Sequence, residues 1–376
     1  MKAAHVPSQR PRDAKLLVVD ASGRLRHAPR ARLADHLNPG DVLIANDAAT
    51  LPASLTGVHA RTGRAIEVRL AGRRSLDVND VRAFTAIVFG AGDHRTRTED
   101  REAPPALREG DVLTLGPLRA TVLRPLHHPR LVLLRFEGIA DAVWTGIARH
   151  GKPIQYAHVQ EPLALWDVWT RVAALPVAFE SPSAGFVLDW QLLSALKARG
   201  VVFATLTHAA GISSTGDDEL DARLPLDEPY NIPSATVRRI VNAKAAGSRV
   251  IALGTTVTRA LEHAASHGPL RAGDGVADQR IGASTPLRVI DAIISGTHEP
   301  GMSHYELLRA FASDAVLRRA SAALERAGYL THEFGDSVLL ERSTCRAFSA
   351  ALELEHRDAG HQIGHAPHCL AVLDAE

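Results

Sequence analysis

The chain has 376 residues and a formal net charge of +1, with 43 lysines and arginines against 42 aspartates and glutamates. Its length predicts about two domains at roughly 150 residues each, and its 45% hydrophobic and 23% charged residues exclude a disordered chain. No apolar run approaches the ~18 residues of a membrane span, and the N-terminus lacks the apolar core of a secretory signal. The two cysteines, Cys345 and Cys369, are too few for a secreted disulfide scaffold. We therefore expect a cytoplasmic protein.

The first 145 residues show the pattern of β-strands. Residues 41–45 form an apolar strand that begins after a Pro-Gly turn and ends at Asn46 and Asp47. Beyond it, short apolar runs alternate with turns rich in glycine, aspartate and arginine, which predicts a small β-barrel or sandwich. The clearest of these runs are residues 65–70, 86–89, 111–115 and 131–136.

After about residue 146, helices and strands alternate. Helices are predicted over residues 163–173, 191–199, 234–246, with Ser234 as N-cap, and 256–265, and strands over residues 177–179, 201–206 and 249–253. This order predicts a mostly parallel sheet or barrel that binds ligands at the carboxyl ends of its strands. We therefore expect an α/β domain of residues 1–55 and 146–376, interrupted by an inserted β-domain of residues 56–145.

Common nucleotide, metalloprotease and hydrolase motifs are absent: the sequence has no GxxxxGK[ST], GxGxxG, HExxH or GxSxG in the required context. A histidine-rich tail offers the ligand types of a metal site, but its glycines and a proline would break a helix, and His127–His128 lies between prolines and predicts a turn. We therefore predict no metal. The tail residues concerned are His356, His361, His365, His368 and Cys369.

Five arginines cluster near the start of the inserted domain. They form either a solvated strand face or a local basic patch that contacts the phosphates of a nucleic acid. The residues are Arg61, Arg64, Arg69, Arg73 and Arg74.

Five segments, in order, resemble motifs of one family, the S-adenosylmethionine:tRNA ribosyltransferase-isomerases of queuosine biosynthesis. They cover most of the chain from about residue 40 to 341, and RVIALGTTVTRALE is nearly intact. The segments are LIANDAATLPA at 43–53, SPSAG at 181–185, RVIALGTTVTRALE at 249–262, VIDAIISGTHEPGMS within 287–303 and FGDSVLL at 334–340.

The resemblance implies a distorted barrel-like α/β domain that carries an inserted small antiparallel β-barrel, in agreement with the alternation of elements. It also implies that S-adenosylmethionine serves as ribosyl donor rather than methyl donor. The ribose would be transferred to the aminomethyl group of a 7-deazaguanine in the tRNA anticodon, adenine and methionine would leave, and epoxyqueuosine-tRNA would form. We expect a monomer.

The matched segments supply candidate site residues, each with a structural alternative. Asp47, His298 and Asp336 are the catalytic candidates, although both aspartates could equally be turn residues. Thr255 and Thr256 stand where a strand passes into a helix, so they could bind an anion or simply cap the helix. The remaining binding candidates are Asn46, Pro182, Ser183, Ala184, Gly185, His208, Glu228, Gly254, Arg259, Glu299 and Ser303.

The sequence departs from the family at several of these segments. Ala48 and Ala49 replace the threonine and arginine of the family's N-D-T-R motif. In the T-L-H-V-G-x-G-T-F motif, the histidine is displaced by one position, to His208, and the G-T-F ending is absent. Of the H-x-M-H-x-E motif, only the glutamate remains, as Glu228. The lysine of H-L-P-K-S is Gly301. Residues 151–158, GKPIQYAH, are similar to a G-R-P-I-x-Y pattern of shorter, divergent members.

Three functions therefore remain open. The chain is the family's tRNA-modifying enzyme, a related enzyme that uses S-adenosylmethionine on a small acceptor or cleaves it, or a binding module that kept the fold and lost the chemistry.

Overall fold

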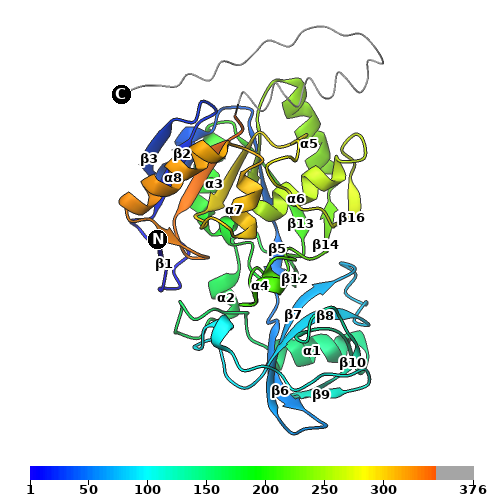
Figure 1. The fold of residues 1–376 in the computed structure, drawn as a ribbon. Helices are drawn as coiled ribbons and strands as arrows, with labels where there is room; N and C mark the ends of the chain where they lie inside the picture. The colour runs from blue at the N-terminus through cyan, green and yellow to red at the C-terminus, as the bar shows by residue number, and fades with distance from the viewer. Residues whose placement is uncertain (344–376) are drawn as a thin grey trace, which may run out of the picture.

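The computed structural model describes residues 1–343, which form an α/β domain and a β-barrel joined through a narrower middle region (Figure 1). The cysteines and the histidine-rich tail lie outside these residues. No helix within residues 1–343 is both long and apolar enough to cross a membrane.

A nine-stranded mixed sheet is the centre of the α/β domain. The pairings β13–β4, β4–β15, β15–β17 and β19–β2 are parallel, and the other four are antiparallel, so the sheet is less parallel than the sequence predicted. In spatial order its strands are β16 (Gly273–Ala277), β14 (Glu228–Ile232), β13 (Val202–His208), β4 (Val42–Asn46), β15 (Val250–Leu253), β17 (Ala292–Gly296), β19 (Ser337–Glu341), β2 (Lys15–Val19) and β3 (Leu25–Pro29).

Helices cover both faces of this sheet, which explains its nearly continuous apolar strands. Alternate residues of β4 illustrate the two faces, because Val42 and Ile44 belong to one core cluster and Leu43 and Ala45 to the other. The first cluster packs against α5 (Ser234–Ala245), α6 (Thr255–Ala264), α7 (Ser303–Leu308) and α8 (Asp314–Arg326). The second packs against the 3-10 helix η1 (Arg30–His36) and α3 (Trp190–Ala198).

The inserted segment forms a closed antiparallel barrel, as the resemblance implied, where the sequence pattern had left a barrel or a sandwich open. Its apolar interior also takes in Val143 and Ile147 of α1 (Ala140–His150). His127 and His128 lie in the predicted turn, between β10 and β11. The barrel strands are β6 (Ser54–His59), β7 (Ala65–Arg73), β8 (Phe84–Phe89), β9 (Val112–Leu115), β10 (Leu118–Pro125) and β11 (Leu131–Phe136).

Short elements connect the two parts. The parallel pair of β5 (Ala48–Thr50) and β12 (Leu175–Ala178) lies between the sheet and the barrel (Figure 1). The remaining elements are β1 (Lys2–Ala3), η2 (Thr98–Asp100), α2 (Leu165–Val168), η3 (Ser183–Val187), α4 (Asp218–Asp221) and β18 (Leu330–Thr331).

Two predicted helix features are wrong. The helix expected over residues 163–173 is only the four residues of α2, because the chain then turns into the middle region, where the carbonyl oxygen of Val168 accepts hydrogen bonds from Thr50 and Ser181. Ser234 is the first residue of α5, and Pro233 occupies the N-cap position without a side-chain hydrogen bond.

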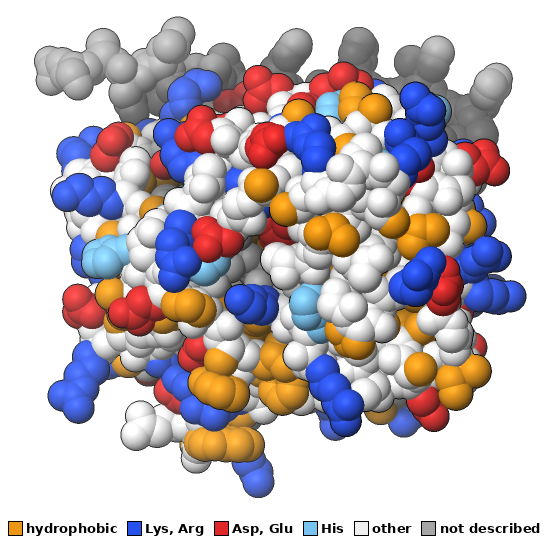
Figure 2. All heavy atoms as spheres, turned by 90° about the horizontal axis from the view of Figure 1, so that it is seen from below, with side chains coloured by type: hydrophobic (Ala, Val, Ile, Leu, Met, Phe, Trp, Pro, Cys, Tyr) orange, Lys and Arg blue, Asp and Glu red, His pale blue; other side chains and the backbone are white. Residues whose placement is uncertain are grey.

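Neither alternative for the five arginines, a solvated strand face or a basic patch, describes the whole group. Arg69 and Arg73 are 1% and 4% exposed, because the outer face of β7 is covered by a cluster that includes Ile212, Leu220 and Leu224 of the α/β domain. Two others, Arg61 and Arg64, form ion pairs with Asp111 and Glu102, and only Arg74 is exposed without a described ion pair. Seen from the barrel end, basic side chains are scattered among acidic ones (Figure 2).

Candidate functional site

A cavity of about 850 Å³ lies at the carboxyl ends of β12, β13, β15 and β17, where the chain leaves the central strands. Thr98 and Glu99 of the barrel line it as well, and Gly216 packs so closely on their backbone that an added Cβ would lie 2.4 Å from the nitrogen of Glu99. The cavity falls within the ~300–1,000 Å³ typical of small-molecule sites. Its main lining segments are residues 180–184, 210–214, 253–256, 295–299 and 331–337.

The turn between β15 and α6 brings Gly254, Thr255 and Thr256 to the cavity. Gly254 has φ 97°, and a Cβ added there would lie 3.1 Å from the Cβ of Ala184, so both backbone conformation and space favour glycine. The hydroxyl of Thr256 accepts a hydrogen bond of 3.2 Å from the side chain of Asn46. The turn is therefore held in place by close packing and by the end of β4.

Asn46 connects three segments beneath the cavity. Its amide nitrogen also donates to the carbonyl oxygen of His208 at 2.9 Å, and its amide oxygen accepts from the backbone nitrogens of Ala48 and His208, both at 3.0 Å. Because all these bonds are internal and Asn46 is 2% exposed, its role in this structure is to position the strand ends.

Arg259, Glu228 and His208 form a buried polar network. Arg259 pairs with Glu228 and donates to the carbonyl oxygens of Ala277, Gln279 and Leu226, while Glu228 also accepts from the backbone nitrogen of Gly211 at 2.6 Å. Burial raises the pKa of Glu228 despite the arginine, and burial followed by the charge of Arg259 lowers the pKa of His208 well below its usual value. The guanidinium group of Arg259 is thus paired with groups of the protein itself.

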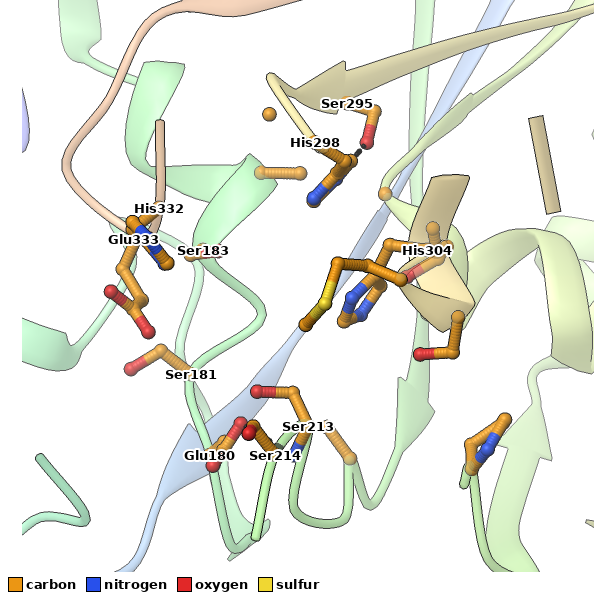
Figure 3. Close-up of a pocket in the computed structure, with 18 of the residues that line it drawn as sticks. Glu180, Ser181, Ser183, Ser213, Ser214, Ser295, His298, His304, His332 and Glu333 are labelled. Atoms are coloured by element: carbon orange, nitrogen blue, oxygen red, sulfur yellow. Dashed lines mark hydrogen bonds between the residues drawn. The ribbon is translucent and has the colours of Figure 1, made fainter. Parts of the chain in front are cut away.

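Two neutral imidazoles face the cavity from the segment after β17 (Figure 3). His298 shares a hydrogen bond of 2.9 Å with the hydroxyl of Ser295, and its ring stacks on His304 with 4.8 Å between centroids. Burial, followed by the neighbouring imidazoles, lowers the pKa of His298 well below its usual value, and burial also lowers that of His304. At neutral pH both rings can therefore donate or accept hydrogen bonds without carrying charge.

Glu180 is the carboxyl group best suited to proton transfer in the cavity. Burial raises its pKa to about 7, against hydrogen bonds from the Ser213 backbone nitrogen and from Tyr156, which lower it. The hydroxyl of Tyr156 lies between Glu180 and the carbonyl oxygen of Ser214, 3.0 Å away, yet it has only one proton to donate. A protonated Glu180 resolves this, since it donates to Tyr156 and leaves the phenol proton for Ser214.

A second group of titratable side chains lies on the same wall. His158, His332 and Glu333 each offer a ligand atom, and these atoms lie within 4.8 Å of one another. Both histidine rings line the cavity and stack with 4.3 Å between centroids. In the part of the chain that the structure describes, this is the one group of three or more His, Cys, Asp or Glu side chains with the spacing of a metal site.

Comparison with known proteins gives the ancestry of this arrangement. The family model described as "Queuosine biosynthesis protein" matches residues 1–340. The chain belongs to this family. Two curated relatives are both named S-adenosylmethionine:tRNA ribosyltransferase-isomerase. The one from Pelobacter propionicus is 30% identical, and the match covers 87% of this chain and 92% of the relative. The one from Thermosynechococcus vestitus is 32% identical, and the match covers 86% of this chain and 90% of the relative.

A crystal structure of an S-adenosylmethionine tRNA ribosyltransferase from Thermotoga maritima is also similar. It has 22% identity and a TM-score of 0.45, with 90% of this chain and 95% of that chain covered.

Most residues expected from the queuosine family's motifs line the cavity. Asn46, Asp47, Gly185 and His208 are not among the lining residues. Asp47 accepts a hydrogen bond of 2.6 Å from the hydroxyl of Thr207, which joins β4 to β13. The expected residues that do line it are Pro182, Ser183, Ala184, Glu228, Gly254, Thr255, Thr256, Arg259, His298, Glu299, Ser303 and Asp336.

Asp336 lines the cavity, but its carboxylate serves the backbone. One oxygen accepts from the Lys15 nitrogen at 2.7 Å and the other from the Leu330 nitrogen at 2.8 Å. Glu299 is half-exposed at the rim, 3.5 Å from the N-terminal amine. The catalytic assignments of Asp47, His298 and Asp336 stay predictions, and of the three only His298 both lines the cavity and has a single side-chain hydrogen bond among the described residues.

The family motifs did not point to the most unusual groups of the cavity. Glu180 directly precedes SPSAG, and His332 and Glu333 directly precede FGDSVLL, so adjacency to a matched segment is a signal that was present in the sequence. Tyr156 and His158 fall within GKPIQYAH, which matched only the divergent members.

Proposed function

We propose that this protein transfers and isomerises the ribosyl group of S-adenosylmethionine onto 7-aminomethyl-7-deazaguanine in a tRNA anticodon, giving epoxyqueuosine-tRNA with release of adenine and methionine. The match to the queuosine family over residues 1–340 carries this proposal. The cavity supports it, because its volume suits a nucleoside-sized donor and it lies where open α/β sheets bind ligands. S-adenosylmethionine acts here as substrate.

Two groups in the cavity suit the steps of this reaction. The sulfonium acidifies the adjacent carbon, and Glu180, with a pKa of about 7, is the base that we assign to remove that proton. The departing adenine needs a hydrogen-bond donor, and the neutral imidazole of His298 supplies one from the opposite side of the cavity (Figure 3). Carboxylates around the cavity favour the positive sulfonium.

A surface next to the cavity suits an RNA loop better than the barrel does. Three of the four tryptophans are exposed, with Trp166 at 77%, Trp190 at 71% and Trp169 at 41%. Trp166 and Trp169 line a shallow depression with Arg10 and Arg171. Arg10 donates to the carbonyl oxygen of Leu188, two residues before Trp190. Indole faces stack on unpaired bases and guanidinium groups bind phosphates, so we assign this tryptophan rim to the anticodon loop.

The tryptophan rim is bonded to the cavity wall. The indole nitrogen of Trp169 donates to the carbonyl oxygen of Thr50, whose hydroxyl lies 3.2 Å from that of the cavity residue Ser181. Gln9 donates to the carbonyl oxygen of Trp169 and accepts from Arg30, which also lines the cavity. An RNA that inserts one base into the cavity would place its neighbouring bases over this rim. A tRNA substrate also fits our expectation of a cytoplasmic protein, and the monomer stays a prediction.

One observation favours a small acceptor as a second candidate function. Ala48 and Ala49, which replace a threonine and an arginine of the family motif, are buried in β5, so these two positions offer a ligand no hydroxyl or guanidinium group. An enzyme of this kind would still consume S-adenosylmethionine in the same cavity.

Chromatography of S-adenosylmethionine incubated with pure protein tests these functions. The proposal predicts adenine and methionine only when tRNA bearing the aminomethyl base is present, with loss of product in the Glu180→Gln variant. Adenine without tRNA would instead establish the small-acceptor function. No consumption in either tube would contradict both and leave a binding module.

Binding of an anticodon stem-loop, followed by quenching of tryptophan fluorescence, tests the rim separately. We expect Trp166→Ala to weaken binding by about 1–3 kcal/mol and Arg171→Ala to reduce the slope of log K against log salt by about one. Ile139→Ala, which changes an exposed apolar residue next to the barrel, is the matched control. Equal binding by all three variants would refute the assignment.

A further inference from the structure

Three side chains from two distant parts of the chain meet on one wall of the cavity. His158 follows α1, whereas His332 and Glu333 lie between β18 and β19, and the ligand atoms of all three lie within 4.8 Å of one another. The Nε2 atom of His158 is 2.9 Å from an Oε2 atom of Glu333. In the close-up, the side chains of His332 and Glu333 lie together above Ser181 and Glu180 (Figure 3).

The backbone at His332 is unusual. With φ 69°, it is the one non-glycine residue with positive φ among residues 1–343. This region is unfavourable for a residue with a side chain, and such residues concentrate at functional sites. The conformation belongs to a tight turn, in which the Gly335 nitrogen donates to the His332 carbonyl oxygen at 2.9 Å. The turn holds the imidazole of His332 against that of His158.

The donor atoms of the group suit a cation. The Nε2 atom of His158 lies 2.9 Å from Oε2 of Glu333, and the rings of His158 and His332 stack with 4.3 Å between centroids. Two imidazoles and a carboxylate therefore meet at one point of the cavity wall, and these are the side-chain groups that bind divalent metal ions such as zinc.

We propose that His158, His332 and Glu333 bind one divalent transition-metal ion with the ligand preferences of Zn²⁺. Two imidazoles and one carboxylate are a common set for zinc, with bonds of about 2.0–2.2 Å. Tetrahedral bonds of that length place ligand atoms about 3.4 Å apart, which lies between the 2.9 Å from His158 to Glu333 and the 4.8 Å within which all three ligand atoms fall.

Three protein ligands leave a fourth position, and this position faces the cavity because all three residues line it. An ion there would bind an oxygen or nitrogen of the cavity's ligand. The sequence predicted no metal because its histidine-rich tail was the only apparent cluster; the group on the cavity wall is invisible until residues 158 and 332 are brought together. This inference is independent of the proposed function.

The test is a titration of the EDTA-treated full-length protein with Co²⁺, followed by the visible absorption of the bound ion, and then competition by Zn²⁺. We expect one equivalent with tetrahedral absorption, displaced by Zn²⁺. His332→Ala and the conservative Glu333→Gln should each weaken binding at least tenfold. A His361→Ala/His365→Ala variant, which removes the spaced pair of the tail, should keep the equivalent, as should His127→Ala in the barrel turn.

The proposal is overturned if the wild type binds no equivalent, or if both cavity variants, with far-UV circular dichroism like that of the wild type, bind as tightly as the wild type does. Loss of the equivalent in the tail variant alone would overturn it as well. Because no S-adenosylmethionine or RNA is present, the result does not depend on whether the ribosyl transfer occurs.

Discussion

The Glu180→Gln substitution should stabilise the protein at alkaline pH while it abolishes activity. The Tyr156 hydroxyl lies within hydrogen-bond reach of both Glu180 and the Ser214 carbonyl oxygen, and the other Glu180 oxygen accepts from the Ser213 nitrogen. When Glu180 is protonated, we expect it to donate to the Tyr156 oxygen, so that the phenol proton goes to Ser214. A glutamine reproduces this pattern, with its NH₂ group in place of the carboxyl proton. It fits the site at every pH without a charge to bury.

The magnitude follows from the difference between a pKa of 4.5 in the unfolded chain and about 7 in the folded one. Below pH 4 both states of the wild type hold the proton. As pH rises, the unfolded chain releases it first, so the folded state loses stability until Glu180 also ionises near pH 7. At about 1.4 kcal/mol per pKa unit, this loss amounts to about 2.5 kcal/mol between pH 5 and pH 8.

Urea unfolding at pH 5 and pH 8, with EDTA present to remove metal ions, measures this effect. We expect the stability of Glu180→Gln relative to the wild type to increase by about 2.5 kcal/mol between the two pH values, whereas substitution of the exposed Glu161 by glutamine should give little change. The same Glu180 variant should lose about 10²–10⁴-fold in rate. Parallel pH dependences for Glu180→Gln and the wild type would show that Glu180 is ionised in the folded protein and would refute the reasoning.

Three further substitutions separate structural from ligand-binding roles. Arg259→Ala should lower the free energy of unfolding by about 3–5 kcal/mol, since Glu228 would stay buried without its partner; a loss of S-adenosylmethionine affinity with unchanged denaturation would contradict this. Gly254→Ala should destabilise the protein by about 1–3 kcal/mol and weaken the binding of S-adenosylmethionine, measured by calorimetric titration. Gly247→Ala, also at positive φ but with open space around it, should leave that binding unchanged. Asp336→Ala should cost about 3 kcal/mol in urea unfolding through two lost backbone hydrogen bonds, and a rate loss without destabilisation would support its catalytic role instead.

Much of the architecture could be predicted from the sequence because local patterns determine it. The apolar runs of β4, β13 and β15 and the glycine that ends α5 marked these elements to within one or two residues. The short α2 was mispredicted because hydrogen bonds to Thr50 and Ser181, distant in sequence, fix its end.

The site was predicted only in part, for the same reason. The matched segments correctly pointed to residues that line the cavity, such as Thr255 and His298. Sequence alone could not show that the guanidinium of Arg259 is paired with Glu228 and with backbone carbonyl oxygens. Nor could it show that the outer face of β7 is an interface, which buries Arg69. Glu180 became notable only once Tyr156 was beside it.

The contribution of Thr98 and Glu99 to the cavity makes the barrel more than an appendage of the α/β domain. The sheet supplies most of the wall, and the barrel supplies a separate part of it, pinned by the backbone contact with Gly216. A substitution in the segment of Thr98 and Glu99 would therefore change the shape of the cavity without disturbing the packing of the sheet. The shape of the cavity thus depends on how the barrel is seated on the α/β domain, and not on the sheet alone.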